Sequence, residues 1–250
     1  MLLENLAYPE VEDYLKEKDI ILIPIGSVEQ HSPYGLMGTD FIAAESIARS
    51  VGDSMGILVA PTLAYGVSPH HMAFKGTITL NPSTLIEVIS DIVRSLITHE
   101  FKRIIFINGH GGNINTLKTT FQRLKAEKLP GYIDVISWYD SSAVRQICQD
   151  IFGDGEGRHA TPGEVSITKY LRPSEFAAKA SDEATLNKPK YYWPLSSVEM
   201  KTVFPDGRME SAPWLATEEF GGRIAAVAVA GLEKKLTEIM NLELVNASAG

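Results

Sequence analysis

Cysteine is almost absent from this sequence, since Cys148 is the only one among 250 residues. A single cysteine excludes an internal disulfide framework and any cysteine-rich zinc module, and is typical of proteins from a reducing compartment. The first residues, MLLENLAYPE, also lack the basic start and apolar core of a signal peptide. We therefore expect a cytoplasmic protein.

An excess of positive charge and long apolar runs are missing too. The formal net charge is −8 and the Lys and Arg residues are scattered, so neither nucleic acid nor an anionic membrane is expected as a partner. No apolar run approaches the roughly 20 residues that span a bilayer. With 44% apolar residues the chain can build a large core, and we expect a single domain over residues 1–250.

Short β-rich apolar runs alternate with amphipathic stretches of helical length, which predicts an α/β fold with a mostly parallel sheet. Buried strands are predicted at 19–26, 56–63, 102–109 and 132–138. Helices are predicted at 8–17, 40–51, 82–100, 114–128, 162–171 and 215–241. From about 180 to 214 a stretch rich in proline, aromatic and polar residues predicts a long irregular insertion, either a lid or an oligomer contact.

Carboxylates and imidazoles follow the predicted strands, where open α/β sheets bind their ligands. Glu29 and His31 come after the first strand, and Asp40 opens the next helix. His110 ends the third strand inside NGHGGN, and a later segment, HATPGEVS, adds a histidine and a glutamate. Such residues form a mixed oxygen and nitrogen ligand set for divalent metals, so together they predict a metal site.

Taken singly, the same residues also fit structural roles. Asp40 suits the N-cap of a helix, and Thr161 and Glu164 fit a capping box with proline at the first helical position. Glu29 and His31 fit a solvated loop pair, and the GHGG stretch fits a tight turn or an anion-binding loop. Only their combination favours a metal centre over these roles.

Other catalytic schemes fit the sequence less well. The glycine-rich stretch lacks the lysine and Ser/Thr of a Walker loop and the third glycine of a dinucleotide fingerprint. There is no G-x-S-x-G motif, and Cys148 lies in the amphipathic run SSAVRQICQDIF, where we expect it on a helix face. Two metal ions that share a hydroxide and polarise a carbonyl would instead catalyse hydrolysis.

The successive motifs GSVEQHSPYGLMGTD, FKGTITL, NGHGGN and HATPGEVS resemble, in order and spacing, those of the creatininase (creatinine amidohydrolase) family. With LATEEFGGRI, the resemblance covers about residues 15–235. It implies a three-layer α/β/α sandwich, frequently assembled into hexamers. It also implies two divalent ions per chain, zinc above all or else manganese or iron, that cleave carbon–nitrogen amide bonds.

The ligand set follows from the same resemblance, which implies that Glu29, Asp40 and His110 bind one ion. Asp40 then bridges to a second ion, held by His31.

One departure from the family concerns this second ion. In creatininase itself it takes a glutamate two residues after the motif histidine, where this chain has Gly112. We expect Glu164, five residues beyond His159, to supply the missing ligand. His159 is then left for proton transfer to the leaving nitrogen, so His159 and Glu164 are the expected catalytic residues.

The substrate pocket is predicted from the resemblance and from neighbouring segments. Trp138 matches a family aromatic, SPHHMAFKGT is expected to contribute His71 and Phe74, and the amides of Gly111 and Gly112 are expected to stabilise the oxyanion. A family tryptophan is replaced by glycine four residues before the motif histidine, which argues against creatinine as the natural substrate.

The predicted function is therefore hydrolysis of a small, possibly cyclic, amide. Deformylation of a formamidopyrimidine nucleotide and cleavage of a small peptide, as in relatives that resemble this chain at NGHGGN, stay open. From other classes, a non-catalytic metal- or nucleotide-binding regulatory protein and a purely structural oligomer also stay open.

Overall fold

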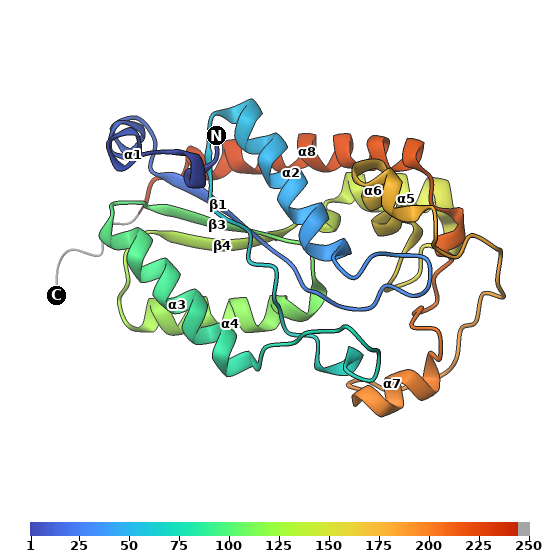
Figure 1. Ribbon diagram of the computed structural model, residues 1–250. Helices are drawn as coiled ribbons and strands as arrows, with labels where there is room; N and C mark the ends of the chain where they lie inside the picture. The colour runs from blue at the N-terminus through green and yellow to red at the C-terminus, as the bar shows by residue number, and fades with distance from the viewer. Residues whose placement is uncertain (245–250) are drawn as a thin grey trace.

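A computed structural model describes residues 1–244 of the chain. Within this range four strands form one parallel sheet in the order β2-β1-β3-β4 (Figure 1). In chain order they are β1 (Ile20–Ile25), β2 (Leu58–Val59), β3 (Arg103–Asn108) and β4 (Tyr132–Ser137). Because all four run the same way, their carboxyl ends meet at one edge of the sheet.

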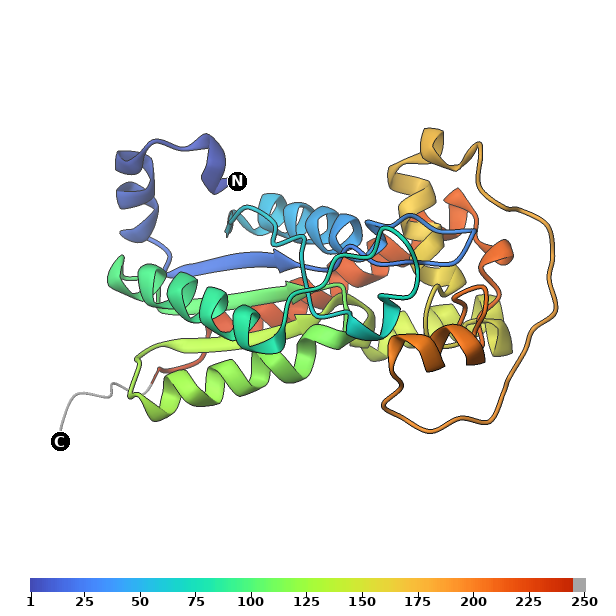
Figure 2. The same ribbon diagram turned by 60° about the horizontal axis from the view of Figure 1, so that its bottom comes forward.

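Helices cover both faces of the sheet, which makes a three-layer α/β/α sandwich (Figures 1 and 2). One face packs against α2 (Thr39–Met55), α5 (Ser142–Phe152), α6 (Pro162–Leu171) and α8 (Glu218–Met240). The other packs against α1 (Tyr8–Leu15), α3 (Pro82–Thr98) and α4 (Ile114–Ala126). The expected fold class is confirmed.

Alternation along the strands divides the core in two. Leu22 and Ile105 point into the first core, and their neighbours Ile23 and Phe106 point into the second. Successive side chains of a strand point to opposite faces, so strands covered on both sides are apolar throughout, as the sequence predicted.

Strand β2 is much shorter than the predicted run 56–63. Its pairing with β1 covers only Leu58 and Val59. Pro61 follows closely and has no N–H to donate, so a regular ladder cannot continue through it. Helix α5 coincides with the amphipathic run around Cys148, whereas a helix at residues 197–203 was not predicted from the sequence.

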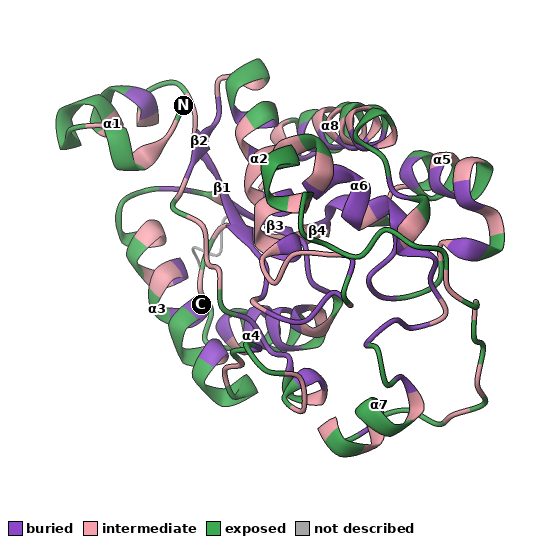
Figure 3. Cartoon of the chain, turned by 45° about the vertical axis from the view of Figure 1, so that its right-hand side comes forward, coloured by how far each residue is buried: buried purple, intermediate pink, exposed green. Residues whose placement is uncertain are grey.

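The segment 180–214 is not wholly irregular, because it contains helix α7 (Ser197–Val203). Ser196 caps this helix by accepting a hydrogen bond from the N–H of Glu199 at 3.3 Å. Figure 3 shows α7 apart from the sandwich helices. A small apolar cluster beneath it holds Leu195, Met200, Phe204 and Met209 together.

Among the described residues we find no helix that combines the length and the hydropathy needed to cross a membrane.

Candidate metal centre

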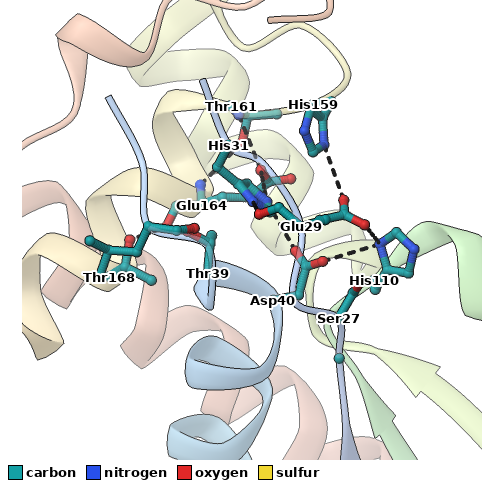
Figure 4. Close-up of polar contacts among 12 residues, drawn as sticks. Ser27, Glu29, His31, Thr39, Asp40, His110, His159, Thr161, Glu164 and Thr168 are labelled. Carbon is teal, nitrogen blue, oxygen red and sulfur yellow. Dashed lines mark hydrogen bonds and ion pairs between the residues drawn. The ribbon is translucent and has the colours of Figure 1, made fainter. Parts of the chain in front are cut away.

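Four predicted ligands converge at the carboxyl edge of the sheet (Figure 4). Glu29 and His31 lie in the loop that follows β1, Asp40 lies in the first turn of α2, and His110 follows β3. All four are buried, with at most 5% of their surface exposed. Charged groups are seldom buried this deeply without a partner of opposite charge or a metal.

Asp40 lies between two histidines. Its Oδ1 is 3.1 Å from His31 Nε2, and its Oδ2 is 3.1 Å from His110 Nδ1. His110 Nδ1 also lies 3.3 Å from Glu29 Oε2. The two oxygens of Asp40 thus face different imidazoles, as a bridging carboxylate requires.

Hydrogen bonds to backbone carbonyls fix the orientation of three imidazoles. His31 Nδ1 donates to the carbonyl of Glu29 at 3.2 Å, and His110 Nε2 donates to that of Val67 at 3.0 Å. His159 Nε2 donates to the carbonyl of Gln30 at 2.7 Å. In each ring the other nitrogen is directed at the carboxylates. Metal-binding histidines are held in this way by their second nitrogen.

Two buried atoms of the cluster make no hydrogen bond among the described residues, namely His31 Nε2 and Asp40 Oδ2. An unpaired buried polar atom is unfavourable, and a divalent cation would satisfy both atoms. Ligand atoms of Glu29, Asp40 and His110 all lie within 4.8 Å of one another. The residues present therefore fit the metal ion that the sequence implies.

A second group of ligand atoms lies within the same limit and contains Glu29, His31 and His159. Nδ1 of His159 is 3.6 Å from Glu29 Oε1. His159 was expected only to transfer a proton, but it also lies close to these ligand atoms.

Glu164 closes a capping box and lies next to the cluster as well. Its N–H donates to Thr161 Oγ1, and its Oε2 accepts from the N–H of Thr161, both at 3.1 Å. The same Oε2 is 3.7 Å from His31 Nε2. The helix cap is present as the sequence suggested, and it holds the carboxylate within reach of His31.

Two residues near Glu29 were not identified from the sequence. Ser68 Oγ donates a short hydrogen bond to Glu29 and also lies 2.5 Å from Ser27 Oγ. The side-chain amide of Gln30 bonds to His71 Nδ1 at 3.0 Å and to the carbonyl of Gly207 at 2.9 Å. Neither residue has a motif of its own, although Gln30 lies between Glu29 and His31 in the sequence.

The acidic and basic side chains of the cluster shift one another's pKa values. Burial by itself lowers the pKa of His31, but the carboxylates of Asp40, Glu164 and Glu29 together outweigh it and raise the pKa to about 9. Burial lowers the pKa of His159 to about 4, helped by the charge of His31. Burial raises the pKa of Glu164 to about 8, despite the opposing effect of His31. Burial opposes ionisation of Glu29, yet the neighbouring histidines, His110 first, together outweigh it and leave the pKa of Glu29 well below its usual range.

Two glycines let the start of α2 approach the sheet. A Cβ on Gly26 would lie 2.3 Å from Phe41 N, and a Cβ on Gly109 would lie 2.1 Å from the carbonyl oxygen of Asp40. Neither distance is tolerated between non-bonded atoms. Glycine at these positions therefore places Asp40 between the ends of β1 and β3.

Gly112 replaces the family's glutamate for a visible steric reason. A Cβ at this position would lie 2.4 Å from His110 Nε2 and 2.4 Å from the carbonyl oxygen of Val67. Any side chain at 112 would thus disturb the hydrogen bond that orients His110. In this chain a further carboxylate has to come from another segment.

A cavity of about 910 Å³ opens beside the cluster. Its lining includes four of the predicted substrate-binding residues, which are His71, Trp138, Gly111 and Gly112. Phe74, the fifth, is not part of the lining. It packs instead against the apolar cluster under α7, with its ring 6.4 Å from that of His71.

Cys148 is buried on α5, as expected for a residue on a helix face. Burial raises the pKa of its thiol, which opposes the thiolate form that a nucleophile needs.

Fold and buried cluster together define an α/β sandwich with a candidate metal-binding cluster at the carboxyl edge of its sheet. Residues 4–236 match the sequence model of the creatininase family, described as creatinine amidohydrolase. The chain belongs to the creatininase family.

Curated relatives carry several activities. The chain is 38% identical to the mycofactocin precursor peptide peptidase of Mycobacterium ulcerans (strain Agy99), over 61% of this chain and 58% of that protein. Across the mycofactocin peptidases it matches, the chain spans about half of their length. It is 25% identical to the creatinine amidohydrolase of Pseudomonas putida, over 94% of this chain and 95% of that protein.

Solved structures share the fold. A crystal structure of creatinine amidohydrolase (creatininase) superposes with a TM-score of 0.82 at 23% identity, covering 97% of this chain and 98% of the other. A manganese form of creatininase gives a TM-score of 0.81 at 24% identity, covering 96% of this chain and 99% of that one.

Proposed function

We propose that the protein is a metal-dependent amidohydrolase that holds two divalent ions and cleaves the carbon–nitrogen bond of a small amide. One observation carries this proposal. Three buried imidazoles, each tied by one nitrogen to a backbone carbonyl, direct the other at the buried carboxylates of Glu29 and Asp40. Membership in the creatininase family supports the same activity.

The proposed ligands divide into two sets that share Asp40. Glu29, Asp40 and His110 hold the first ion, in agreement with one group of converging ligand atoms. His31, Asp40 and Glu164 would hold the second ion, since Glu164 Oε2 lies 3.7 Å from His31 Nε2. Zinc and manganese are the candidate metals, because solved creatininases include a manganese form and a Zn-Zn form.

Bound divalent ions would lower the pKa of water and polarise the amide carbonyl. The chain's own residues prepare the rest of the reaction. Ser68 holds Glu29 in place by a hydrogen bond. His159 lies at the cavity wall and moves a proton to the leaving nitrogen. The backbone amides of Gly111 and Gly112 lie in the same wall and stabilise the charge on the carbonyl oxygen.

Gly155, four residues before His159, stands where the family has a tryptophan and so bears on which amide is the substrate. This residue lacks the aromatic side chain of the family, and even a Cβ here would lie 3.1 Å from both Ala212 Cβ and Leu215 Cδ1, so a larger side chain would need these neighbours to shift. We therefore propose an amide other than creatinine. A peptide bond is the second candidate, favoured by the 38% identity to a peptide peptidase and by the size of the cavity.

Metal content tests this proposal. Protein purified without chelator should contain about two zinc, manganese or iron ions per chain by mass spectrometry, and should hydrolyse members of a panel of formamides, cyclic amides and dipeptides. Absence of bound metal after these ions are offered would overturn the proposal. Bound metal without hydrolysis across a broad panel would favour a non-catalytic binding protein.

We further propose that the chain acts in the cytoplasm as a homo-oligomer, with a hexamer as the assembly that the family resemblance implies. Light scattering coupled to size-exclusion chromatography measures the mass of the assembly. A mass of about six chains is expected, and a monomer would contradict it.

A further inference from the structure

Two hydrogen-bond donors in the cavity wall have no partner. Trp138 and Tyr139 are consecutive residues of the 3-10 turn η4 (Trp138–Asp140), directly after β4. Trp138 Nε1 and Tyr139 Oη are both buried and make no hydrogen bond among the described residues. Both side chains line the cavity that also contains Asp40 and His110. Buried donors in proteins are nearly always satisfied, so their partner here is expected from a bound molecule.

The hydroxyl of Tyr139 lies beside the metal centre. A Cβ on Gly111 would be 3.7 Å from Tyr139 Oη, so the hydroxyl faces the turn that follows the ligand His110. The rings of Trp138 and Tyr139 meet edge to face with centroids 5.5 Å apart, which fixes them relative to each other. The two rings therefore hold a fixed orientation in the cavity wall, with the hydroxyl of Tyr139 beside the turn after His110.

The chemistry of the pair requires an acceptor on the ligand. An indole N–H can only donate. Burial raises the pKa of Tyr139, so its hydroxyl stays protonated and donates as well. A group that accepts from both, such as a carbonyl oxygen, matches them.

The charges around the cavity favour a neutral acceptor over a carboxylate. Three cationic residues line the cavity, and each is paired with an acidic residue of the same lining at 3.4–3.5 Å: Arg145 with Asp140, Lys188 with Asp154, and Arg158 with Glu210. These pairs leave little positive charge to attract an anion. A neutral carbonyl avoids the desolvation penalty of a buried charge.

We propose that Tyr139 Oη, with Trp138 Nε1 beside it, binds a carbonyl oxygen of the substrate other than the carbonyl of the bond that is cut. The substrate is then an amide with a second neutral carbonyl a few bonds from the first, as in an N-acylated amino-acid amide. This inference rests on the proposed function, because it takes the metal centre as the place of cleavage. A contact to Trp138 was expected from the family resemblance, whereas Tyr139 and the second carbonyl are new.

Two hydroxamates on the zinc-loaded protein test the inference by calorimetry. N-acetylglycine hydroxamate carries the second carbonyl, and pentanohydroxamate has a chain of the same length without it. Both carry the same metal-binding group. The wild type should bind N-acetylglycine hydroxamate about tenfold more tightly, since one hydrogen bond to a buried donor is worth about this factor.

Tyr139→Phe should abolish this preference and leave the affinity for pentanohydroxamate unchanged. Tyr132→Phe is the matched control, because the hydroxyl of Tyr132 donates to Asp134 Oδ2 at 2.8 Å and the residue is not part of the cavity lining. It should keep the preference. The melting temperature of metal-free Tyr139→Phe should stay close to that of the wild type, since the most that the protein loses is a weak interaction of this hydroxyl with Ser137.

Each other outcome overturns a defined part of the argument. Equal affinity of the wild type for both hydroxamates, or a preference that survives in Tyr139→Phe, overturns the inference alone. A lowered melting temperature with an intact preference assigns Tyr139 a purely structural role. Absence of zinc-dependent binding of either hydroxamate would overturn the proposed metal centre and the inference with it.

Discussion

Charged groups lie at both ends of strand β3, and they differ in whether the protein itself satisfies their hydrogen bonds. At its start, Arg103 Nη1 lies 2.5 Å from Asp19 Oδ1, Nε donates to the carbonyl of Ile239 at 3.1 Å, and Nη2 donates to that of Leu242 at 2.8 Å. Every nitrogen of the guanidinium has a partner. Beyond its end, two buried atoms of the cluster around His110, His31 Nε2 and Asp40 Oδ2, take part in ion pairs at 3.1 Å but make no hydrogen bond among the described residues.

This difference separates a structural ion pair from a binding site. The pair of Arg103 and Asp19 is complete within the protein, so it needs nothing from solution. The cluster of Glu29, His31, Asp40 and His110 keeps two buried atoms without a hydrogen bond, which a bound cation would satisfy. Buried polar atoms of this kind in an otherwise well-paired protein mark a candidate functional site.

Replacement of one aspartate at each end gives the largest expected contrast. Asp40→Asn should reduce metal affinity by more than about 100-fold, because loss even of residues that only support ligands costs 10–100-fold. Asp19→Asn should leave metal content unchanged and lower the melting temperature. Metal analysis and thermal unfolding of both variants test this. Full metal content and activity in Asp40→Asn would reject its bridging role.

A second contrast uses two capping boxes. Glu164→Gln should lower metal content from about two ions to about one per chain, because the neutral amide is a poorer ligand. Glu199→Gln is the control, since Glu199 closes the box of α7 by accepting from the N–H of Ser196 at 2.8 Å. It should lose only stability, and only slightly, because the hydrogen bond of the capping glutamate is exposed to solvent. If both variants lose stability alone, Glu164 is a helix cap and not a ligand.

His159 lies between the roles of ligand and proton carrier. His159→Ala should keep its metal ions and lower turnover by about 100-fold, the usual contribution of a general acid or base. Metal analysis and steady-state kinetics on whichever amide the screen identifies distinguish the two roles. Loss of an ion would instead place His159 among the ligands, with Glu29 and His31. Unchanged turnover would remove it from the mechanism.

The smallest expected effect is on the pH dependence of stability in metal-free protein. Against the effect of burial, the surrounding carboxylates, Asp40 first, raise the pKa of His31 from 6.5 to about 9, so the folded state holds this proton more tightly than the unfolded chain. The resulting stabilisation is complete below pH 6.5 and is lost as the pH rises to about 9. Denaturant unfolding at several pH values should show this fall, reduced in Asp40→Asn. A flat profile would contradict it.

The fold was largely predictable from the sequence, because apolar runs at β1 and β3 are buried on both faces and leave no other arrangement. The regions that were missed have local causes. Pro61 shortens β2, and the burial of α7 is provided by a separate small cluster around Met200. Neither the shortening of β2 nor the burial of α7 can be predicted from the hydropathy pattern of the sequence.

Within the site, predictability depends on residue type. Glu29, His31, Asp40 and His110 were identified because their side chains are typical ligands in a recognisable order. Ser68, in contrast, reaches Glu29 only through the path of its loop. A serine without a motif carries no signal until distances are known. Phe74 was expected in the cavity wall but is not part of it, because packing against the cluster under α7 sets the direction of its side chain.

Gly26 and Gly109 give the metal centre a constraint that lies outside its ligands. A single methyl group at either position would displace the first turn of α2, and Asp40 with it, by a collision with backbone atoms that cannot move aside. In a library of substitutions sorted by metal loading, positions 26 and 109 should therefore be as intolerant as the ligands themselves. The absence of a Cβ at these two glycines thus limits which substitutions this site tolerates.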